Sequence, residues 1–564
     1  MFSKVFYFYT NIFFAVLFTF SINFLSEKKL LANETSYIRS YYGSILAGQI
    51  ANYNNDSKKS ADFFNYASDI NPANDQIYNL ALMSLIVSGD IKSAIKKIEQ
   101  HNKKFGKTTS KSVIANFITF VSNVKKQKYK EALKELDKNE NFLITEKMKP
   151  ILKAWLLSDL EQATEAINNY EYKSDGLALS NIYFHHLALL QNYHNNQTLA
   201  KNTFEKHLEF FDLDKLRTLY FYSGFIIKNY KNNILNNEYI SQFLKENEDH
   251  YFSDYLKQKN KLIKTISSPS EGISETLYNL ARTLYTQNMN ETSLALAQTS
   301  LFLDPNNHMV KYLIFLNLNN LNKKKLSMGY LKSIPEGSYI SWNATISLAN
   351  LYIDLKKYDI ATQFLKKLEN KNNKKVEVFY KLGEMFHTQK KYDNAINYFS
   401  KAISGVNKIE KKYWYLYYSR GMSYERSAKW KLAEKDFLYS LELSPDEPLT
   451  LNYLGYTWID LGKNIEKAHK LIIKAVGLRP KDGYFVDSLG WAYYRMGEYK
   501  KAVTELEKAV GLVPNDPIIN DHLGDALWRA GYKNEAVYQW KRALIYKPEN
   551  ELKEEILFKL KQGL

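Results

Sequence analysis

The chain of 564 residues contains no cysteine. This absence excludes disulfide bonds, thiolate metal sites and a lipid-modified amino-terminal cysteine. The stability of the fold must therefore come from the packing of side chains.

Glycine and proline are scarce, with 22 Gly and 11 Pro in the whole chain. Because both residues interrupt helices, their low counts favour one long helical solenoid over several globular domains. Between residues 413 and 550 the few glycines recur regularly, since Gly421, Gly455, Gly490 and Gly524 are 34, 35 and 34 residues apart. Small residues and a closing proline follow with the same period: Ala433, Ala468, Ala502 and Ala536; Ser440, Ala475, Ala509 and Ala543; Pro445, Pro480, Pro514 and Pro548. A fixed period in this range is typical of stacked repeats.

Each copy of this pattern predicts an antiparallel pair of helices. In the last copy Asp516 is a good N-cap and Pro517 suits the first helical position. Gly531 then breaks the helix, and a second amphipathic helix runs from about Lys533 until Pro548 blocks its continuation. The recurring small residues fall where two helix axes must approach closely, so their recurrence is a packing requirement.

Catalytic motifs are missing as well. The sequence has no glycine-rich phosphate loop, no paired-histidine zinc motif and no nucleophile-elbow spacing. The one histidine cluster is His185, His186 and His194; adjacent histidines point to different faces of a helix, and none has the four-residue spacing that aims two at one metal. We therefore predict a non-enzymatic protein with no catalytic residue, metal or cofactor.

Acidic residues are outnumbered, 60 against 77 basic residues, which gives a net charge of +17. Residues 92–153 alone hold 16 Lys against six acidic residues, a local excess of +10. Only 9 of the basic residues are Arg, which fits a solvated, lysine-rich surface produced by an AT-rich genome. The alternative is that this segment attracts an anionic polymer or lipid headgroups. Nucleic acid is disfavoured because the chain is predicted to be exported.

Residues 1–32 are predicted to be a targeting segment. Lys4 precedes an apolar run over residues 5–25, and the small residue Ala32 fits the end of a signal peptide. The run is also long enough to remain as a membrane anchor, and a third alternative is that it is neither. We expect the protein to be in the periplasm or at the periplasmic face of the inner membrane.

The rest of the chain divides by the strength of the repeat signal. Residues 33–265 are predicted to be degenerate helical repeats, in which Gly48 and Phe64 mark one of the clearer units. Residues 266–273, a cluster of Ser, Pro and Gly, are predicted to be a linker. Residues 274–550 form the regular array, and residues 551–564 a capping helix that closes its end.

The repeated letters resemble the tetratricopeptide repeat, whose consensus has Gly at its eighth position, Ala at the twentieth and twenty-seventh, and Pro at the thirty-second. The eleventh and twenty-fourth positions, aromatic or large and apolar in that family, are here Tyr424, Trp458, Tyr493 and Leu527, and Phe437, Ile472, Leu506 and Trp540. One departure is an extra residue within 463–465. The resemblance implies an all-α, right-handed α-solenoid of tetratricopeptide-type helix pairs, degenerate in the N-terminal half.

In this family the first helix of each pair lines a concave groove that binds a peptide. The resemblance places the groove positions at Tyr418, Met422, Arg426, Asn452, Tyr456, Tyr484, Asp487, Trp491, Tyr494, Arg495, Asp521, Asp525, Trp528 and Arg529. Aromatic residues beside Arg and carboxylates are common anchors at interfaces. The alternative is that Tyr456, Trp491 and Trp528 only pack against the next repeat.

At the level of the whole chain, residues 267–272, 482–491 and 520–526 resemble exported tetratricopeptide proteins of alphaproteobacteria. This resemblance implies a scaffold in the periplasm or at the membrane. We expect a non-enzymatic scaffold that binds a protein or peptide partner during envelope assembly. The alternative is a membrane-anchored accessory subunit of polysaccharide synthesis or export that contacts an anionic polymer, and a cytoplasmic recruiter would require residues 1–32 to be neither signal nor anchor.

Overall fold

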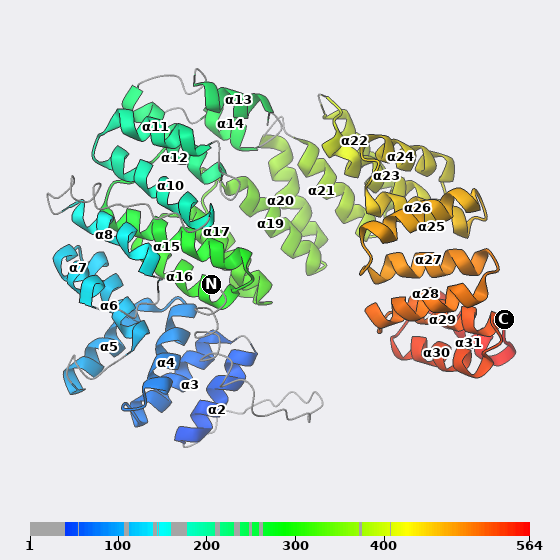
Figure 1. The fold of residues 1–564 in the computed structure, drawn as a ribbon, viewed down its shortest axis with the longest axis horizontal. Helices are drawn as coiled ribbons and strands as arrows, with labels where there is room; N and C mark the ends of the chain where they lie inside the picture. Colours follow the sequence, from blue (N-terminus) through cyan, green and yellow to red (C-terminus); the bar gives the residue numbers. More distant parts are fainter. Residues whose placement is uncertain are drawn as a thin grey trace. The chain divides into compact units, whose positions relative to one another are not determined.

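A computed structural model describes most of the chain. The described residues are 40–54, 56–105, 112–138, 144, 146–159, 177–208, 215–230, 237–246, 251–258, 263–371, 375–406 and 408–564. The predicted targeting segment, residues 1–32, lies outside them. All regular structure in the described residues is helical, with no β-strand, as predicted (Figure 1). Among these helices, none is both long and apolar enough to cross a membrane.

The chain divides into two compact units, residues 1–84 and residues 85–564. The first unit contains α2 (Tyr41–Tyr53), α3 (Ser57–Ile70) and the beginning of α4 (Asp75–Val87). Helices α2 and α3 form a pair in which Gly48 lies directly over the buried ring of Phe64. The two residues occupy the eighth and twenty-fourth positions of the unit that they were predicted to mark.

The second unit begins with helices that lack most of the consensus letters. They are α5 (Ile91–Phe105), α6 (Val113–Lys125), α7 (Tyr129–Lys138), α8 (Lys149–Leu157), α10 (Leu177–Tyr193), α11 (Gln197–Leu208), α12 (Lys215–Tyr230), α13 (Glu238–Glu246) and α14 (Tyr251–Gln258). Neighbours such as α6 with α7 and α10 with α11 still pair. The helix-pair pattern therefore persists where the letters are lost.

Residues 269–273, most of the segment 266–273 that was predicted to be a linker, are instead the first turn of a helix. Ser268 is the N-cap of α15 (Pro269–Thr286), and its hydroxyl accepts a hydrogen bond from the Glu271 amide at 3.3 Å. Gly272 is buried so close to the indole of Trp155 on α8 that an added Cβ would come within 2.2 Å of the ring. The prediction was wrong because Ser, Pro and Gly here cap a helix and allow a close approach, which are roles those residues also fill in loops.

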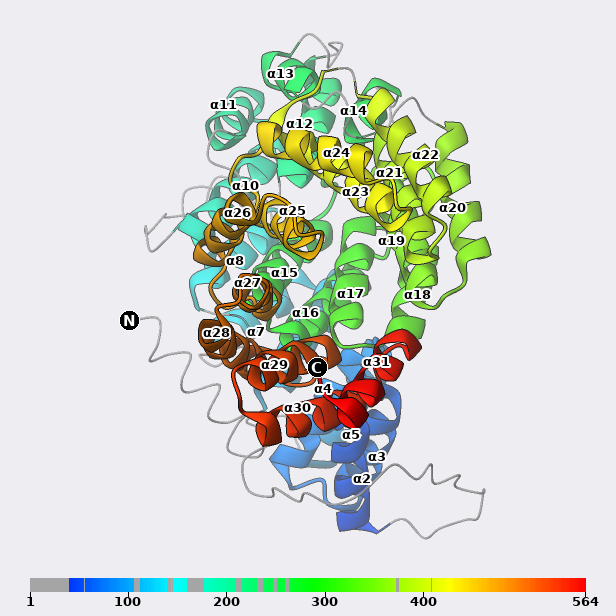
Figure 2. The same ribbon diagram turned by 90° about the vertical axis from the view of Figure 1, so that its right-hand side faces the viewer.

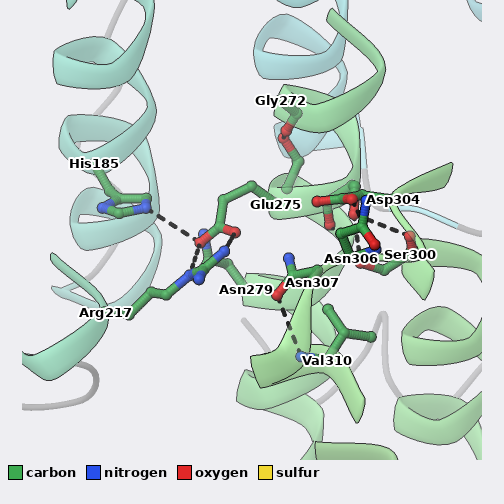
Figure 3. Close-up of polar contacts among 12 residues, drawn as sticks. His185, Arg217, Gly272, Glu275, Asn279, Ser300, Asp304, Asn306, Asn307 and Val310 are labelled. Carbon is green, nitrogen blue, oxygen red and sulfur yellow. Dashed lines mark hydrogen bonds and ion pairs between the residues drawn. The ribbon is translucent and has the colours of Figure 1, made fainter. Parts of the chain in front are cut away.

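Buried charges further join α15 to the preceding helices (Figure 3). Glu275 on α15 is fully buried, and both of its carboxylate oxygens accept hydrogen bonds from Arg217 on α12, at 3.1 and 2.6 Å. His185 on α10 lies 3.4 Å from the same carboxylate. Burial would raise the pKa of Glu275, but the Arg217 guanidinium outweighs it and holds this pKa well below its usual range.

The adjacent histidine faces another way, as predicted. His186 accepts a hydrogen bond from the Trp155 indole N–H at 3.1 Å. Burial, reinforced by His185, lowers the pKa of His186 to about 3, so its ring is neutral. His185 thus lies beside a buried carboxylate, whereas His186 accepts a hydrogen bond from an indole.

From α15 onward the helices alternate regularly. They are α15, α16 (Asn290–Leu303), α17 (His308–Asn320), α18 (Lys324–Lys332), α19 (Ser341–Asp354), α20 (Tyr358–Lys371), α21 (Lys375–Thr388), α22 (Tyr392–Ser404), α23 (Trp414–Arg426), α24 (Trp430–Leu443), α25 (Pro448–Asp460), α26 (Ile465–Leu478), α27 (Gly483–Arg495), α28 (Tyr499–Leu512), α29 (Pro517–Arg529), α30 (Lys533–Ile545) and α31 (Asn550–Gln562). Each odd-numbered helix from α15 to α29 packs against the even-numbered helix that follows it. The pair α17 and α18 was overlooked in the sequence, because its eighth position is Phe315, where the pairs from α19 onward have Gly or Ala.

The last pair shows how the consensus letters shape the array. Asp516 caps α29 by accepting hydrogen bonds from the amides of Ile518 and Ile519, at 2.8 and 3.1 Å. Gly531 ends the helix with a φ of 96°, which favours glycine. Gly524 lies against the buried indole of Trp540, and a Cβ there would come within 2.4 Å of it. The predicted packing role of the small residues is confirmed at this contact.

Candidate functional site

The first helices of the last four pairs lie next to one another. Within residues 408–564, α25 contacts α27 and α27 contacts α29, whereas the second helices make at most sparse contacts with each other. A stack whose first helices are closer together than its second helices curves toward the first helices. Figure 2 shows α23, α25, α27 and α29 along the inner side of an arc, with α24, α26, α28 and α30 along its outer side. We call the surface of these four helices the first-helix face.

A three-ring stack joins α27 to α29 on this face. The Trp491 indole lies between the rings of Tyr494 and His522, with centroids 4.7 and 4.2 Å away and interplanar angles of 12° and 16°. His522 Nδ1 is also 2.9 Å from a carboxylate oxygen of Asp487. Burial would lower the pKa of His522, but Asp487, Asp521 and Asp525 raise it. An imidazole whose pKa is raised thus stacks on the face of an indole, which attracts positive charge.

A buried ionic cluster continues from the stack toward the end of the array. Lys559 on α31 donates to both oxygens of Asp521, at 3.0 and 2.8 Å, and to Asp525 at 2.8 Å. Asp525 also accepts the Trp540 indole N–H at 2.9 Å. Burial and the neighbouring Asp525 raise the pKa of Asp521 to about 6. Burial would lower the pKa of Lys559, yet the two carboxylates raise it.

Three of the predicted groove carboxylates are therefore not free contacts. Asp487, Asp521 and Asp525 are only 6%, 4% and 4% exposed and are held by His522 and Lys559. The prediction located them on the correct helices but missed that the next helix supplies their cations. A buried carboxylate requires such a partner, because its desolvation is otherwise too costly.

Most predicted aromatic positions are half-buried between repeats. Tyr418 packs on Trp414, Phe437 and Tyr453 with centroid separations of 5.9, 6.2 and 5.9 Å. Trp528 lies 5.3 Å from Trp540. The half-buried predicted residues are Tyr418, Met422, Asn452, Tyr456, Trp491, Tyr494 and Trp528. Of the residues in the alternative considered above, Trp491 packs against the next repeat through His522, whereas the contact of Trp528 with Trp540 lies within its own pair.

Two of these half-buried residues keep unused hydrogen-bonding groups. The indole N–H of Trp491 and the amide oxygen of Asn452 are buried and have no hydrogen-bond partner. A buried polar group without a partner is costly, so such groups are uncommon and need an explanation. These two groups belong to adjacent first helices, α27 and α25.

The remaining predicted residues are exposed. Arg426, Arg495 and Arg529 lie at the ends of α23, α27 and α29, and Tyr484 at the start of α27 is 56% exposed. Arg495 donates to the backbone oxygen of Asp460 at 3.0 Å. The first-helix face therefore has a half-buried aromatic centre and a row of arginines along one edge.

Two residues of the site were missed in the sequence. His522 stands one position after a predicted groove residue, and Lys559 occupies the ninth repeat position of α31, which was treated only as a cap. Counting the repeat register through α31 would have placed Lys559 beside Asp525. Among the described residues, no group of His, Asp and Glu side chains is arranged to hold a metal ion.

Comparisons with known proteins agree with this architecture. Residues 490–531 match a model described as TPR repeat, and residues 376–404 match one described as tetratricopeptide repeat. These two segments of the chain are therefore tetratricopeptide repeats. It is 38% identical over 87 residues to the TPR repeat-containing protein PA4667 of Pseudomonas aeruginosa, a match that covers 15% of each chain. It is 30% identical over 112 residues to the Protein CTR9 homolog of Arabidopsis thaliana, which covers 20% of this chain and 10% of that protein.

Solved structures with similar folds include the Cut9–Hcn1 hetero-tetramer of APC/C. That match covers 93% of this chain and 97% of the other, with 16% identity and a TM-score of 0.39. TTC0263, a thermophilic TPR protein of Thermus thermophilus, covers 33% of this chain and 98% of its own, with 19% identity and a TM-score of 0.29. The matched segments span only 15% and 10% of the two sequence relatives above.

Proposed function

We propose that this protein is a non-enzymatic scaffold whose first-helix face, α23 to α29, binds a protein or peptide partner in the bacterial envelope. Tetratricopeptide repeats generally mediate protein or peptide binding. The envelope role is the proposal, and it is supported by the resemblance of residues 1–32 to a signal peptide or anchor. A fusion of alkaline phosphatase after Leu564 tests the location, because that enzyme becomes active only outside the cytoplasm; an inactive fusion would contradict export.

The observation that carries the binding proposal is the set of exposed side chains on this face, Arg426, Arg495, Arg529 and Tyr484. The Trp491 N–H and the Asn452 oxygen lack partners, but both atoms are buried, so they are not offered to a peptide on the surface. Arginine and tyrosine side chains are common anchors at interfaces. Arg426, Arg495 and Arg529 along the edge would add attraction for an acidic segment of the partner.

Affinity capture from envelope extracts tests this proposal. The bait is the full chain, compared with a triple variant, Arg426→Glu, Arg495→Glu and Arg529→Glu. The matched control is Lys435→Glu, Lys470→Glu and Lys541→Glu, which makes the same change of net charge on exposed residues of the second helices α24, α26 and α30. We expect a partner that the control retains and that the arginine variant loses.

One further variant sharpens the result. Tyr484→Ala removes the exposed ring at the start of α27, and it should weaken capture about 10-fold, because truncating an anchor residue of an interface typically costs more than about 1 kcal/mol. Equal capture by the wild type, the arginine variant and Tyr484→Ala would exclude the first-helix face as the binding site.

A second candidate function rests on the lysines of residues 92–153. Most of those described are exposed, and the ion pairs of this segment include Lys126 with Glu99 and Lys153 with Asp137, at 3.3 and 3.4 Å. A polysaccharide-associated subunit would use this excess of positive charge to contact an anionic polymer. Its binding would fall steeply with ionic strength and would be insensitive to the arginine variant, which separates it from the first proposal.

A further inference from the structure

The outward face of α31 exposes two adjacent apolar side chains. On its inward side Ile556 is fully buried, and Leu552 and Leu560 pack against the core of the last repeats. On the opposite side Leu557 is 42% exposed and Phe558 is 58% exposed. The terminal helix of a repeat array needs a polar outer face for solubility, so this pair of residues is unexpected there.

Charged residues flank the apolar pair symmetrically. Glu554 lies about one turn before Leu557, and Lys561 about one turn after it. Both are exposed, and in the described part of the chain neither forms an ion pair with another residue. With 3.6 residues per turn, Glu554 and Lys561 project almost opposite Ile556. The outward face is therefore acidic, then apolar, then basic along one line.

We propose that the outward face of α31 pairs with the same face of a second copy of this chain in antiparallel orientation. A two-fold axis passing between Leu557 and Phe558 brings Glu554 opposite Lys561 of the partner subunit. The same operation brings Lys561 opposite Glu554 of the partner subunit, so both ion pairs form at once. This is the self-complementary pattern that a two-fold interface requires.

The charge pattern selects this partner and orientation. A parallel pairing would place each carboxylate beside the other carboxylate and each ammonium beside the other ammonium. A uniformly acidic or uniformly basic partner would be repelled by one end of the face. A second copy satisfies both ends and covers Leu557 and Phe558 as well. The proposal is independent of peptide binding, because α31 lies outside the first-helix face.

The contact is expected to be weak when the proteins are dilute. A single pair of short helices buries far less than the roughly 1,200 Å² of a stable interface, although α30 beside it exposes Tyr538 and Ile545, at 67% and 71%. The net charge of +17 on each copy opposes association. The dimer should therefore become more stable once moderate salt screens that repulsion. We therefore expect a reversible equilibrium of monomer and dimer.

Sedimentation velocity on the full chain in mild non-ionic detergent, over a hundredfold range of concentration, tests the proposal. The wild type should shift from monomer to dimer. Glu554→Lys alone and Lys561→Glu alone should each weaken dimerisation at least tenfold, because each creates two like-charge pairs. The combined variant should recover to within about threefold of the wild type, as should an equimolar mixture of the two single variants.

Controls separate the interface from folding. Lys500→Glu makes the same charge change as Lys561→Glu at an exposed site on α28, away from α31, and it should dimerise like the wild type. Circular dichroism should show unchanged helicity for every variant, since the substituted residues are exposed. A wild type that stays monomeric throughout would overturn the proposal. So would a combined variant, or a mixture, that dimerises no better than the single variants.

Discussion

Lys559, on the last helix, has its ammonium 2.8 Å from a carboxylate oxygen of Asp521 on α29. The two residues are 38 positions apart in the sequence, and their side chains are only 13% and 5% exposed. The capping helix thus contributes more than an apolar cover, because it supplies the cation for a pair of buried carboxylates. Helix α31 thus adjoins the first-helix face at this end without being part of it.

Replacing Lys559 by Met should destabilise the end of the array. The substitution keeps the length of the side chain but leaves Asp521 and Asp525 buried without a cation, so we expect a loss of about 2–3 kcal/mol. Hydrogen exchange of residues 517–562 measures it locally, as faster exchange in α29, α30 and α31. Removing the charges together, with Asp521→Asn and Asp525→Asn added, should recover part of the loss. Equal exchange in the single and triple variants would show that charge compensation is not the cause.

The same cluster predicts an unusual dependence of stability on pH. The pKa of Asp521 is raised to about 6, and the pKa of His522 is raised as well. A raised pKa means that the folded state binds more protons than the unfolded state, so stability increases as the pH falls through these values. Lowering the pH from about 7.5 to about 5.5 should stabilise the last repeats by about 1 kcal/mol. The groups that face Asp521 are His522, Asp525 and Lys559.

Local hydrogen exchange, corrected for its intrinsic pH dependence, measures this effect. The amides of α29 and α31 should be more protected at the lower pH, whereas α19 and α20, outside the cluster, provide the internal reference. Asp521→Asn should reduce the gain to the part contributed by His522. A loss of protection on mild acidification would contradict the raised pKa values.

The repeat array could be predicted from the sequence because its consensus residues are set by the packing of the two helices within one pair. Gly524 and Trp540 lie in contact, as their eighth and twenty-fourth repeat positions require. The fourteen groove positions could only be assigned to helix faces. Whether a side chain such as Asp521 is exposed depends on the neighbouring helix, and Lys559 is far away in the sequence.

The failures have the same origin. Residues of the types found at Ser268, Pro269 and Gly272 occur both in loops and at the capped, closely packed start of a helix. Only the position of Trp155 decides between these two structures. The buried pair of Arg217 and Glu275 has no local signature, because its members are 58 residues apart. A repeat register can locate a contact between helices where it continues, as it does to Lys559, but not where the consensus letters are lost, as at Arg217 and Glu275.

Two glycine substitutions should have opposite effects on stability. Gly524→Ala introduces a Cβ 2.4 Å from the Trp540 ring, so overpacking should cost about 1–3 kcal/mol. Gly511→Ala lies in α28, where a Cβ meets no atom within 4 Å, and it should stabilise that helix by about 0.5–1 kcal/mol. Denaturant unfolding followed by tryptophan fluorescence compares the two. If both variants were stabilised, the repeated glycines would not be needed for close packing.

Glu275→Gln should be among the most damaging single changes in the N-terminal part of the second unit. It leaves the Arg217 guanidinium, which is 6% exposed, without its bidentate carboxylate. Removing one partner of a buried ion pair typically costs about 3–5 kcal/mol. The loss should appear as faster hydrogen exchange in α12 and α15 together, because the pair joins those helices. The double variant Arg217→Met, Glu275→Gln provides the control: it removes both charges, and it should cost less than Glu275→Gln alone. If the costs of the two single variants instead added up in the double variant, the ion pair would not be what couples α12 to α15.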